Sequence, residues 1–193
     1  MKKALLPTIC ILLCTLCIIF VPTEAEAAIY EDTLRLHILA PSDSVNDQAL
    51  KLQIRDKILE KYARVLNSAG SLEDAEFTVS KNLGNIESDC NEWIREFGYS
   101  YTAKAELINE WYGTREYSTF TLPSGNYASL KITIGEGEGQ NWWCVMYPPM
   151  CLDTSVKTDG IYTKEEEKLI SNDGYHIKFK LLEATSELFK RRK

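Results

Sequence analysis

Histidine is scarce in this chain, and the motifs that group metal ligands or surround catalytic nucleophiles are missing. It has two histidines, His37 and His176, and contains neither a His-Glu-x-x-His motif nor paired Cys-x-x-Cys motifs. A zinc site needs three or four convergent ligands, and the sequence groups none. A Gly-x-Ser-x-Gly nucleophile elbow is also absent. We therefore predict no metal, no cofactor and no catalytic residue.

Positive charge is the second shortage, because 22 lysines and arginines stand against 28 aspartates and glutamates, for a net charge of −6. Such a chain has no electrostatic reason to bind nucleic acid. The glycine-rich stretch Gly135–Gly139 matches neither a P-loop nor a dinucleotide fingerprint, and its two glutamates would repel phosphate. We interpret it as a flexible connector and predict neither a nucleic-acid partner nor a small-molecule substrate.

The N-terminal segment is almost without charge. Lys2 and Lys3 precede eighteen uncharged residues, and Ala25-Glu26-Ala27 then offers a small-x-small cleavage site. This is the order of a secretory signal peptide, so we predict a leader over residues 1–27 and a single secreted domain over residues 28–193. Eighteen apolar residues also just reach across a bilayer, which leaves an uncleaved N-terminal anchor as the alternative.

Three cysteines follow the leader: Cys90, Cys144 and Cys151. Cys90 falls on the apolar stripe of a predicted helix, which favours an inert core thiol. The other two cysteines are separated by six residues that include Pro148-Pro149, a spacing that lets them approach bridging distance. Because export permits disulfides, we predict a Cys144–Cys151 disulfide.

Two capping boxes predict two helices in the first half of the domain. The pattern Ser44–Asp47 starts one helix at about Val45, and Ser71–Asp74 starts a longer one. Gly84 lies inside the longer helix, where glycine costs about 1 kcal/mol relative to alanine. We therefore expect close packing at Gly84.

The remaining periodicity mostly predicts strands. Trp142–Tyr147 is a continuous apolar run, which indicates a central strand covered on both faces. Helices followed by strands with short connections predict an α+β fold, with a mainly antiparallel meander, two N-terminal helices and a short C-terminal helix. The predicted strands are Leu34–Leu39, Tyr101–Ile108, Arg115–Leu122, Ala128–Ile134, Trp142–Tyr147 and Tyr175–Lys180, and the later helices are Lys164–Ile170 and Leu181–Phe189.

Two segments, residues 34–56 and 139–152, are richer in polar and aromatic residues than a fold requires. Tryptophan, tyrosine and arginine dominate binding hot spots, so we predict a partner-contact region in these segments. Its candidate residues are Arg35, His37, Ser42, Asp43, Asp47, Gln48, Trp142, Trp143, Pro148 and Pro149.

Each segment also has a purely structural interpretation. The polar residues of the first segment can form a buried hydrogen-bond network that ties strand to helix, with Arg35 or His37 bonded to Asp43 or Asp47. In the second segment, Trp142 and Trp143 can straddle a sheet, one on each face, as part of the core.

Together the two segments resemble the family of stage II sporulation protein R. The motifs that carry the resemblance are Leu34-Arg35-Leu36-His37-Ile38, Ser42-Asp43-Ser44, Asp47-Gln48, Lys51, Arg55-Asp56, Leu122-Pro123-Ser124-Gly125-Asn126-Tyr127, Gly135–Gly139 and Asn141–Cys151. The last of these is specific, because few sequences place Trp-Trp-Cys and Pro-Pro-x-Cys so close together.

The resemblance implies a signal and names no catalytic residue. Proteins of this family are exported from the forespore into the space between the forespore and mother-cell membranes. There they activate a membrane-embedded aspartic protease that cleaves the precursor of sigma factor E. Two other hypotheses remain open: a secreted cell-wall or peptide hydrolase that uses Asp43 and Asp47, and a passive structural protein of the envelope.

Overall fold

The computed structural model describes residues 24–66, 68–117, 120–150 and 162–170. The chain divides into two compact units. One comprises Tyr30–Tyr112 and Gly125–Thr163, and the other Met1–Ile29, Gly113–Ser124 and Lys164–Lys193. Cys151, His176, the predicted strand Tyr175–Lys180, the predicted C-terminal helix and residues 1–23 of the predicted leader lie outside the described residues.

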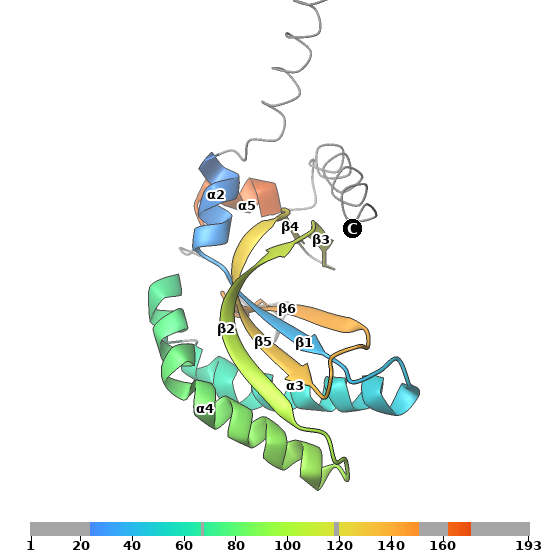
Figure 1. The fold of residues 1–193 in the computed structure, drawn as a ribbon. Helices are drawn as coiled ribbons and strands as arrows, with labels where there is room; N and C mark the ends of the chain where they lie inside the picture. Colours follow the sequence, from blue (N-terminus) through green and yellow to red (C-terminus); the bar gives the residue numbers. More distant parts are fainter. Residues whose placement is uncertain (1–23, 67, 118–119, 151–161, 171–193) are drawn as a thin grey trace, which may run out of the picture. The chain divides into compact units, whose positions relative to one another are not determined.

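The larger unit is built on a four-stranded sheet with the strand order β2-β5-β1-β6 (Figure 1). These strands are β1 (Leu34–Leu39), β2 (Ala103–Tyr112), β5 (Gly125–Ile134) and β6 (Asn141–Tyr147). β1 pairs parallel with β5, whereas β1–β6 and β2–β5 are antiparallel. The predicted α+β class with a mainly antiparallel sheet is confirmed.

Two details of the predicted sheet are wrong. β1 lies between β5 and β6, so the strands do not form a simple meander. As a result β6 is an edge strand of this sheet, although its continuous apolar run predicted a central one. The run is explained instead by burial, because Cys144 to Tyr147 are all buried at that edge.

Two long helices, α3 (Val45–Leu66) and α4 (Leu72–Glu96), pack against each other and cover one face of the sheet (Figure 1). Both begin as predicted. The backbone N–H of Asp47 donates to Ser44 Oγ at 3.1 Å, and Ser71 is the N-cap of α4. The core lies between helices and sheet, and its fully buried residues include Leu36, Leu50, Ile54, Ile86, Ile94, Leu130 and Ile132.

Gly84 is exposed on α4, and an added Cβ would meet no atom within 4 Å. The expected close packing is therefore wrong. We predict that Gly84→Ala raises the free energy of unfolding by about 0.5–1 kcal/mol, because alanine restricts the unfolded chain and favours the helix. Urea unfolding followed by circular dichroism measures the change. A loss of stability would contradict an open helix surface at this position.

The smaller unit contains a short ribbon rather than the predicted strand Arg115–Leu122. β3 (Arg115–Glu116) and β4 (Thr121–Leu122) pair antiparallel. The chain turns between them, where the Tyr117 N–H donates to the Phe120 carbonyl at 2.7 Å and the two rings stack with centroids 4.4 Å apart. The residues that favour β-structure predicted strand here correctly, but they did not predict that the segment forms two paired strands.

Two short helices complete the described chain: α2 (Glu24–Glu31) and α5 (Lys164–Ile170). α5 has the predicted bounds. α2 includes Ala27, so the predicted cleavage point falls within this helix, and cleavage stays a prediction. Among the described helices, none combines the length and the apolar character needed to cross a membrane.

Candidate functional site

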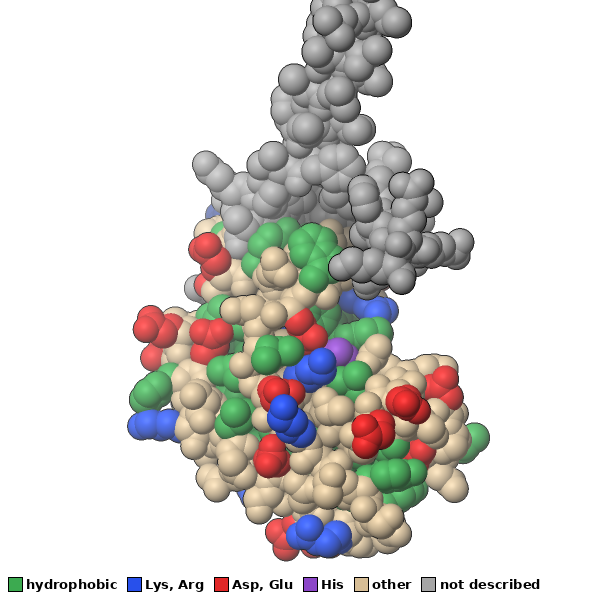
Figure 2. All heavy atoms as spheres, viewed as in Figure 1, with side chains coloured by type: hydrophobic (Ala, Val, Ile, Leu, Met, Phe, Trp, Pro, Cys, Tyr) green, Lys and Arg blue, Asp and Glu red, His purple; other side chains and the backbone are tan. Residues whose placement is uncertain are grey.

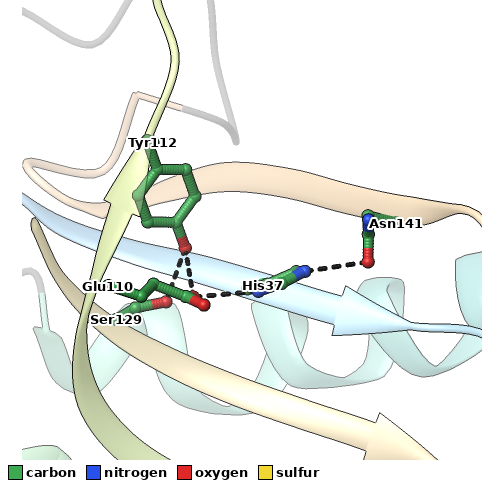
Figure 3. Close-up of polar contacts among 5 residues, drawn as sticks. All are labelled: His37, Glu110, Tyr112, Ser129 and Asn141. Atoms are coloured by element: carbon green, nitrogen blue, oxygen red, sulfur yellow. Dashed lines mark hydrogen bonds and ion pairs between the residues drawn. The ribbon is translucent and has the colours of Figure 1, made fainter. Parts of the chain in front are cut away.

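A polar cluster lies on the sheet face that α3 and α4 do not cover. Because side chains alternate along a strand, the core residues Leu36 and Ile38 leave Arg35 and His37 on the opposite face of β1. Glu110 and Tyr112 from β2 and Ser129 from β5 join them there, as Figure 3 shows. With Asn141 from β6, four strands build one cluster, which we call the open-face cluster: Arg35, His37, Glu110, Tyr112, Ser129 and Asn141.

His37 is held on both sides of its ring. Its Nδ1 lies 2.8 Å from Glu110 Oε1, and its Nε2 lies 3.0 Å from Asn141 Oδ1 (Figure 3). Both partner atoms are acceptors, so both bonds form together when both ring nitrogens carry hydrogen. Trp143 stacks on the ring, with centroids 5.6 Å apart. The imidazole therefore has a fixed position and orientation.

Glu110 is the anionic centre of the cluster. Burial alone would raise the pKa of its carboxyl group, but hydrogen bonds from His37 and Tyr112, the charge of His37 and a bond from Ser129 outweigh it. Together they lower the pKa from 4.5 to about 2. Burial also raises the pKa of Tyr112, and Glu110, which accepts the Tyr112 hydroxyl at 2.7 Å, raises it further.

Arg35 is fully buried against two tyrosine rings. Its guanidinium carbon lies 3.9 Å from the ring centroid of Tyr112 and 5.0 Å from that of Tyr127. An arginine packed on aromatic faces gains cation–π stabilisation, which grows as water is excluded. The cluster therefore combines a buried cation, packed against tyrosine rings, with a hydrogen-bonded histidine.

The geometry favours a scaffold over a catalytic centre. A histidine–carboxylate pair serves as a general base when the other ring nitrogen faces a substrate proton, but Asn141 occupies Nε2 of His37. The hydroxyl groups of Tyr112 and Ser129 bond each other at 2.7 Å, and Ser129 is fully buried. No group of three potential metal ligands occurs among the described residues.

The other predicted polar residues form a second network at the turn between β1 and α3. Ser42 Oγ donates to Asp47 Oδ2, and the side-chain amide of Gln48 donates to the Ser42 carbonyl at 2.9 Å. Asp43 Oδ1 accepts the backbone N–H of Gln140 at 2.7 Å. The network therefore ties the β1–α3 turn to the loop between β5 and β6.

The structural interpretation of the first segment is right about a network and wrong about the partners of His37. His37 bonds Glu110 and Asn141 rather than Asp43 or Asp47, because its side chain leaves β1 on the open face before the turn begins. Lys51, which is buried, extends the network. Its Nζ donates to the Gln140 carbonyl at 2.8 Å, and burial lowers the pKa of this amine.

We predict that Asp47→Ala lowers the free energy of unfolding by about 1–2 kcal/mol, because it orphans two hydroxyl groups and removes an acid from the first turn of α3. Those hydroxyls belong to Ser42 and Tyr101. The control is Asp56→Ala on the same helix, whose carboxylate makes an exposed pair with Arg55 and should change stability by less than about 0.5 kcal/mol. Equal losses in urea unfolding would contradict the structural role of Asp47.

The two tryptophans straddle the sheet at β6. Trp142 packs against the core on the helix side, where the Arg55 guanidinium carbon lies 4.5 Å from its ring centroid. Trp143 stacks on His37 on the open face. Pro148 and Pro149 follow the end of β6, and the Tyr147–Pro148 peptide bond is cis. The ten predicted contact residues thus lie in several places rather than in one region.

The cysteines follow the prediction as far as the structure describes them. Cys90 is a buried free thiol, and burial, with the nearby charges of Asp89 and Glu87, raises its pKa to about 12. This confirms a core thiol. Cys144 is disulfide-bonded, and since Cys151 lies outside the described residues, the pairing of the two stays a prediction.

A comparison with protein families decides the relationship. The family model described as stage II sporulation protein R matches residues 30–157, which include all four strands of the sheet and both long helices. The chain belongs to the stage II sporulation protein R family. The stage II sporulation protein R of Bacillus subtilis (strain 168) is 30% identical over an alignment of 184 residues, which covers 82% of this chain and 82% of that relative. No solved structure matches.

Membership in the stage II sporulation protein R family makes the chain a sporulation signalling protein. The family is not a known enzyme family. The matched region contains both motif segments, together with the open-face cluster and the turn network that they build. Glu110, Tyr112, Ser129 and Asn141 were absent from the predicted site, and only the pairing of distant strands reveals them.

Proposed function

We propose that this chain is an exported signal that activates, by contact, a membrane-embedded aspartic protease that processes the precursor of sigma factor E. The observation that carries the proposal is the family match over residues 30–157, the whole of the sheet and its helices. The proposal of a signal rather than a catalyst is also supported by the polar residues of the two networks, which bond to one another. His37, Glu110 and Asp47 are all used by internal hydrogen bonds.

Activation by contact requires unequal binding to two states of the protease. A signal shifts its receptor only as far as its preference for the active state allows. A nearly complete switch needs about 5 kcal/mol of such preference. A surface that is already ordered helps, because less entropy is lost on binding. The hydrogen bonds of the β1–α3 turn and the stacked rings of the open face provide that order.

The proposed place of action is the space between the forespore and mother-cell membranes. The basic start, uncharged run and Ala-x-Ala site of residues 1–27 support export. The disulfide at Cys144 suits the same location, because disulfides persist outside the reducing cytosol.

Reconstitution in growing cells tests this function. The protease and the sigma-factor precursor are expressed together, with this chain present, absent or deprived of residues 1–27, and precursor cleavage is followed by immunoblot. We expect cleavage only with the complete chain. Cleavage that is equal without the chain, or none when the chain is shown to be folded and exported, would reject the proposal.

A further inference from the structure

One end of the sheet carries apolar side chains that the fold leaves in solvent. Val45, the first residue of α3, is 85% exposed, and Tyr101 is 37% exposed. Tyr99 stacks on Tyr101 with ring centroids 6.2 Å apart. We call this end the acidic tip and define it by Asp43, Val45, Tyr99, Tyr101, Glu136 and Glu138.

Close contacts bring the parts of the acidic tip together. The Tyr99 hydroxyl donates to the Asn46 carbonyl at 3.1 Å, directly beside Val45. The Tyr101 hydroxyl lies 3.4 Å from Asp47 Oδ2 in the same turn of α3. A Cβ at Gly135 would lie 3.3 Å from both Pro41 and Tyr101. The β5–β6 loop therefore starts against the same tyrosine.

The backbone of the acidic tip is braced from both sides. The Gly139 N–H donates to the Ala40 carbonyl at 2.9 Å, and the Gly135 N–H donates to the Thr102 carbonyl at 2.8 Å. Gly135 and Gly137 have positive φ values of 59° and 67°, a conformation that glycine adopts at little cost. The loop is therefore held in place, contrary to the interpretation of residues 135–139 as a flexible connector.

The exposed charge around these apolar groups has one sign, because the nearby Lys51 is buried. Asp43, Glu136 and Glu138 are exposed, and residues 40–47, 99–102 and 135–140 contain no lysine or arginine. On the right of Figure 2, over the start of α3, acidic and hydrophobic side chains lie together without a basic side chain among them. By contrast, the exposed Phe77 on α4 has a basic neighbour, Lys81, whose Nζ lies 4.4 Å from the ring centroid.

We infer that the acidic tip is the docking surface for a partner polypeptide segment that presents an apolar side chain flanked by lysine or arginine. The apolar centre gains from desolvation, and the acidic rim attracts and orients a basic partner. This inference rests on the proposed function, because the partner is the protein that the signal activates. The inference places the partner contact at residues that the fold leaves accessible, rather than at the largely buried open-face cluster.

The test uses the cleavage assay with the complete chain and four variants. Val45→Asp and the double variant Glu136→Lys with Glu138→Lys alter the acidic tip. Their matched controls are Val65→Asp, on the same helix, and Glu60→Lys with Glu92→Lys, two exposed helix positions. Immunoblots of the exported fraction and thermal unfolding by circular dichroism establish equal amounts and intact folds.

We expect both tip variants to reduce precursor cleavage at least tenfold and both controls to stay within twofold of the unchanged chain. If the tip variants support as much precursor cleavage as the unchanged chain, the inference is overturned while the proposed function stays intact. If the control variants reduce precursor cleavage as much as the tip variants do, the inference is also overturned, because the effect would not be specific to the acidic tip. Absence of cleavage with the unchanged chain would instead reject the proposed function, and the inference with it.

Discussion

Replacing His37 by alanine is expected to lower the free energy of unfolding by about 2–3 kcal/mol, because it leaves a mostly buried carboxylate without a hydrogen-bond partner. The Nδ1 atom of His37 lies 2.8 Å from Glu110, and the two side chains are only 9% and 19% exposed. The change also removes the ring on which Trp143 stacks. Urea unfolding at neutral pH measures the loss.

Two comparisons make this expectation specific. Lys131 lies opposite His37 in the β1–β5 register and is half-buried, and Lys131→Ala should cost less than about 0.5 kcal/mol. In a Glu110→Gln background, His37→Ala should cost about 1–2 kcal/mol less than in the unchanged chain. Equal costs in the two backgrounds would mean that the pair contributes nothing beyond packing.

Acid should remove the contribution of Glu110 to stability. Its pKa is about 2 in the folded chain and 4.5 as a free side chain. A depressed folded pKa stabilises the fold above the unfolded pKa, and this gain is lost as the pH falls from 4.5 towards 2. We therefore expect the stability advantage of the unchanged chain over Glu110→Gln to shrink by about 1–2 kcal/mol between about pH 6 and about pH 3.

Glu106→Gln is the matched control for this titration. Glu106 lies on the same strand but pairs with Lys104 at the surface, where both side chains are more than a third exposed. Solvent screening makes such a pair weak, so the advantage of the unchanged chain over Glu106→Gln should be nearly independent of pH. If the stability advantage of the unchanged chain over Glu110→Gln instead stays constant down to about pH 3, the result would contradict a hydrogen-bonded carboxylate with a lowered pKa.

Local features of the fold could be predicted from the sequence because they depend on neighbouring residues. Helix starts at Ser44 and Ser71 follow from side chains within one turn, and both formed. The alternation in β1 correctly separated Leu36, in the core, from His37, on the other face. The apolar stripe likewise placed Cys90 in the core.

Features that depend on strand order could not be predicted in this way. His37 and Glu110 are 73 positions apart, and they meet only because β5 pairs with both β1 and β2. The apolar run of β6 reports burial, which an edge strand and a central strand can share. The same limit explains why Asp43 and Gln140, which are 97 positions apart, were not recognised as partners.

The β1–α3 turn in the acidic tip shows how the local sequence pattern and the structure complement each other. The sequence singled out Ser42, Asp43, Asp47 and Gln48 as unusually polar for a turn. The structure uses their hydrogen bonds to brace a backbone that presents Val45 to solvent. The polar residues thus serve the fold, and the accessible apolar residue beside them is the stronger candidate for partner contact.

The most direct test of the central claim is a titration of the exported protein against membranes that contain the protease and the sigma-factor precursor. Precursor cleavage is measured as a function of the amount of added protein. The account predicts no cleavage without the protein and a saturable rise as it is added, as expected for occupancy of a binding site. Cleavage independent of the amount of folded protein, or none at any amount, would contradict a signal that acts by contact.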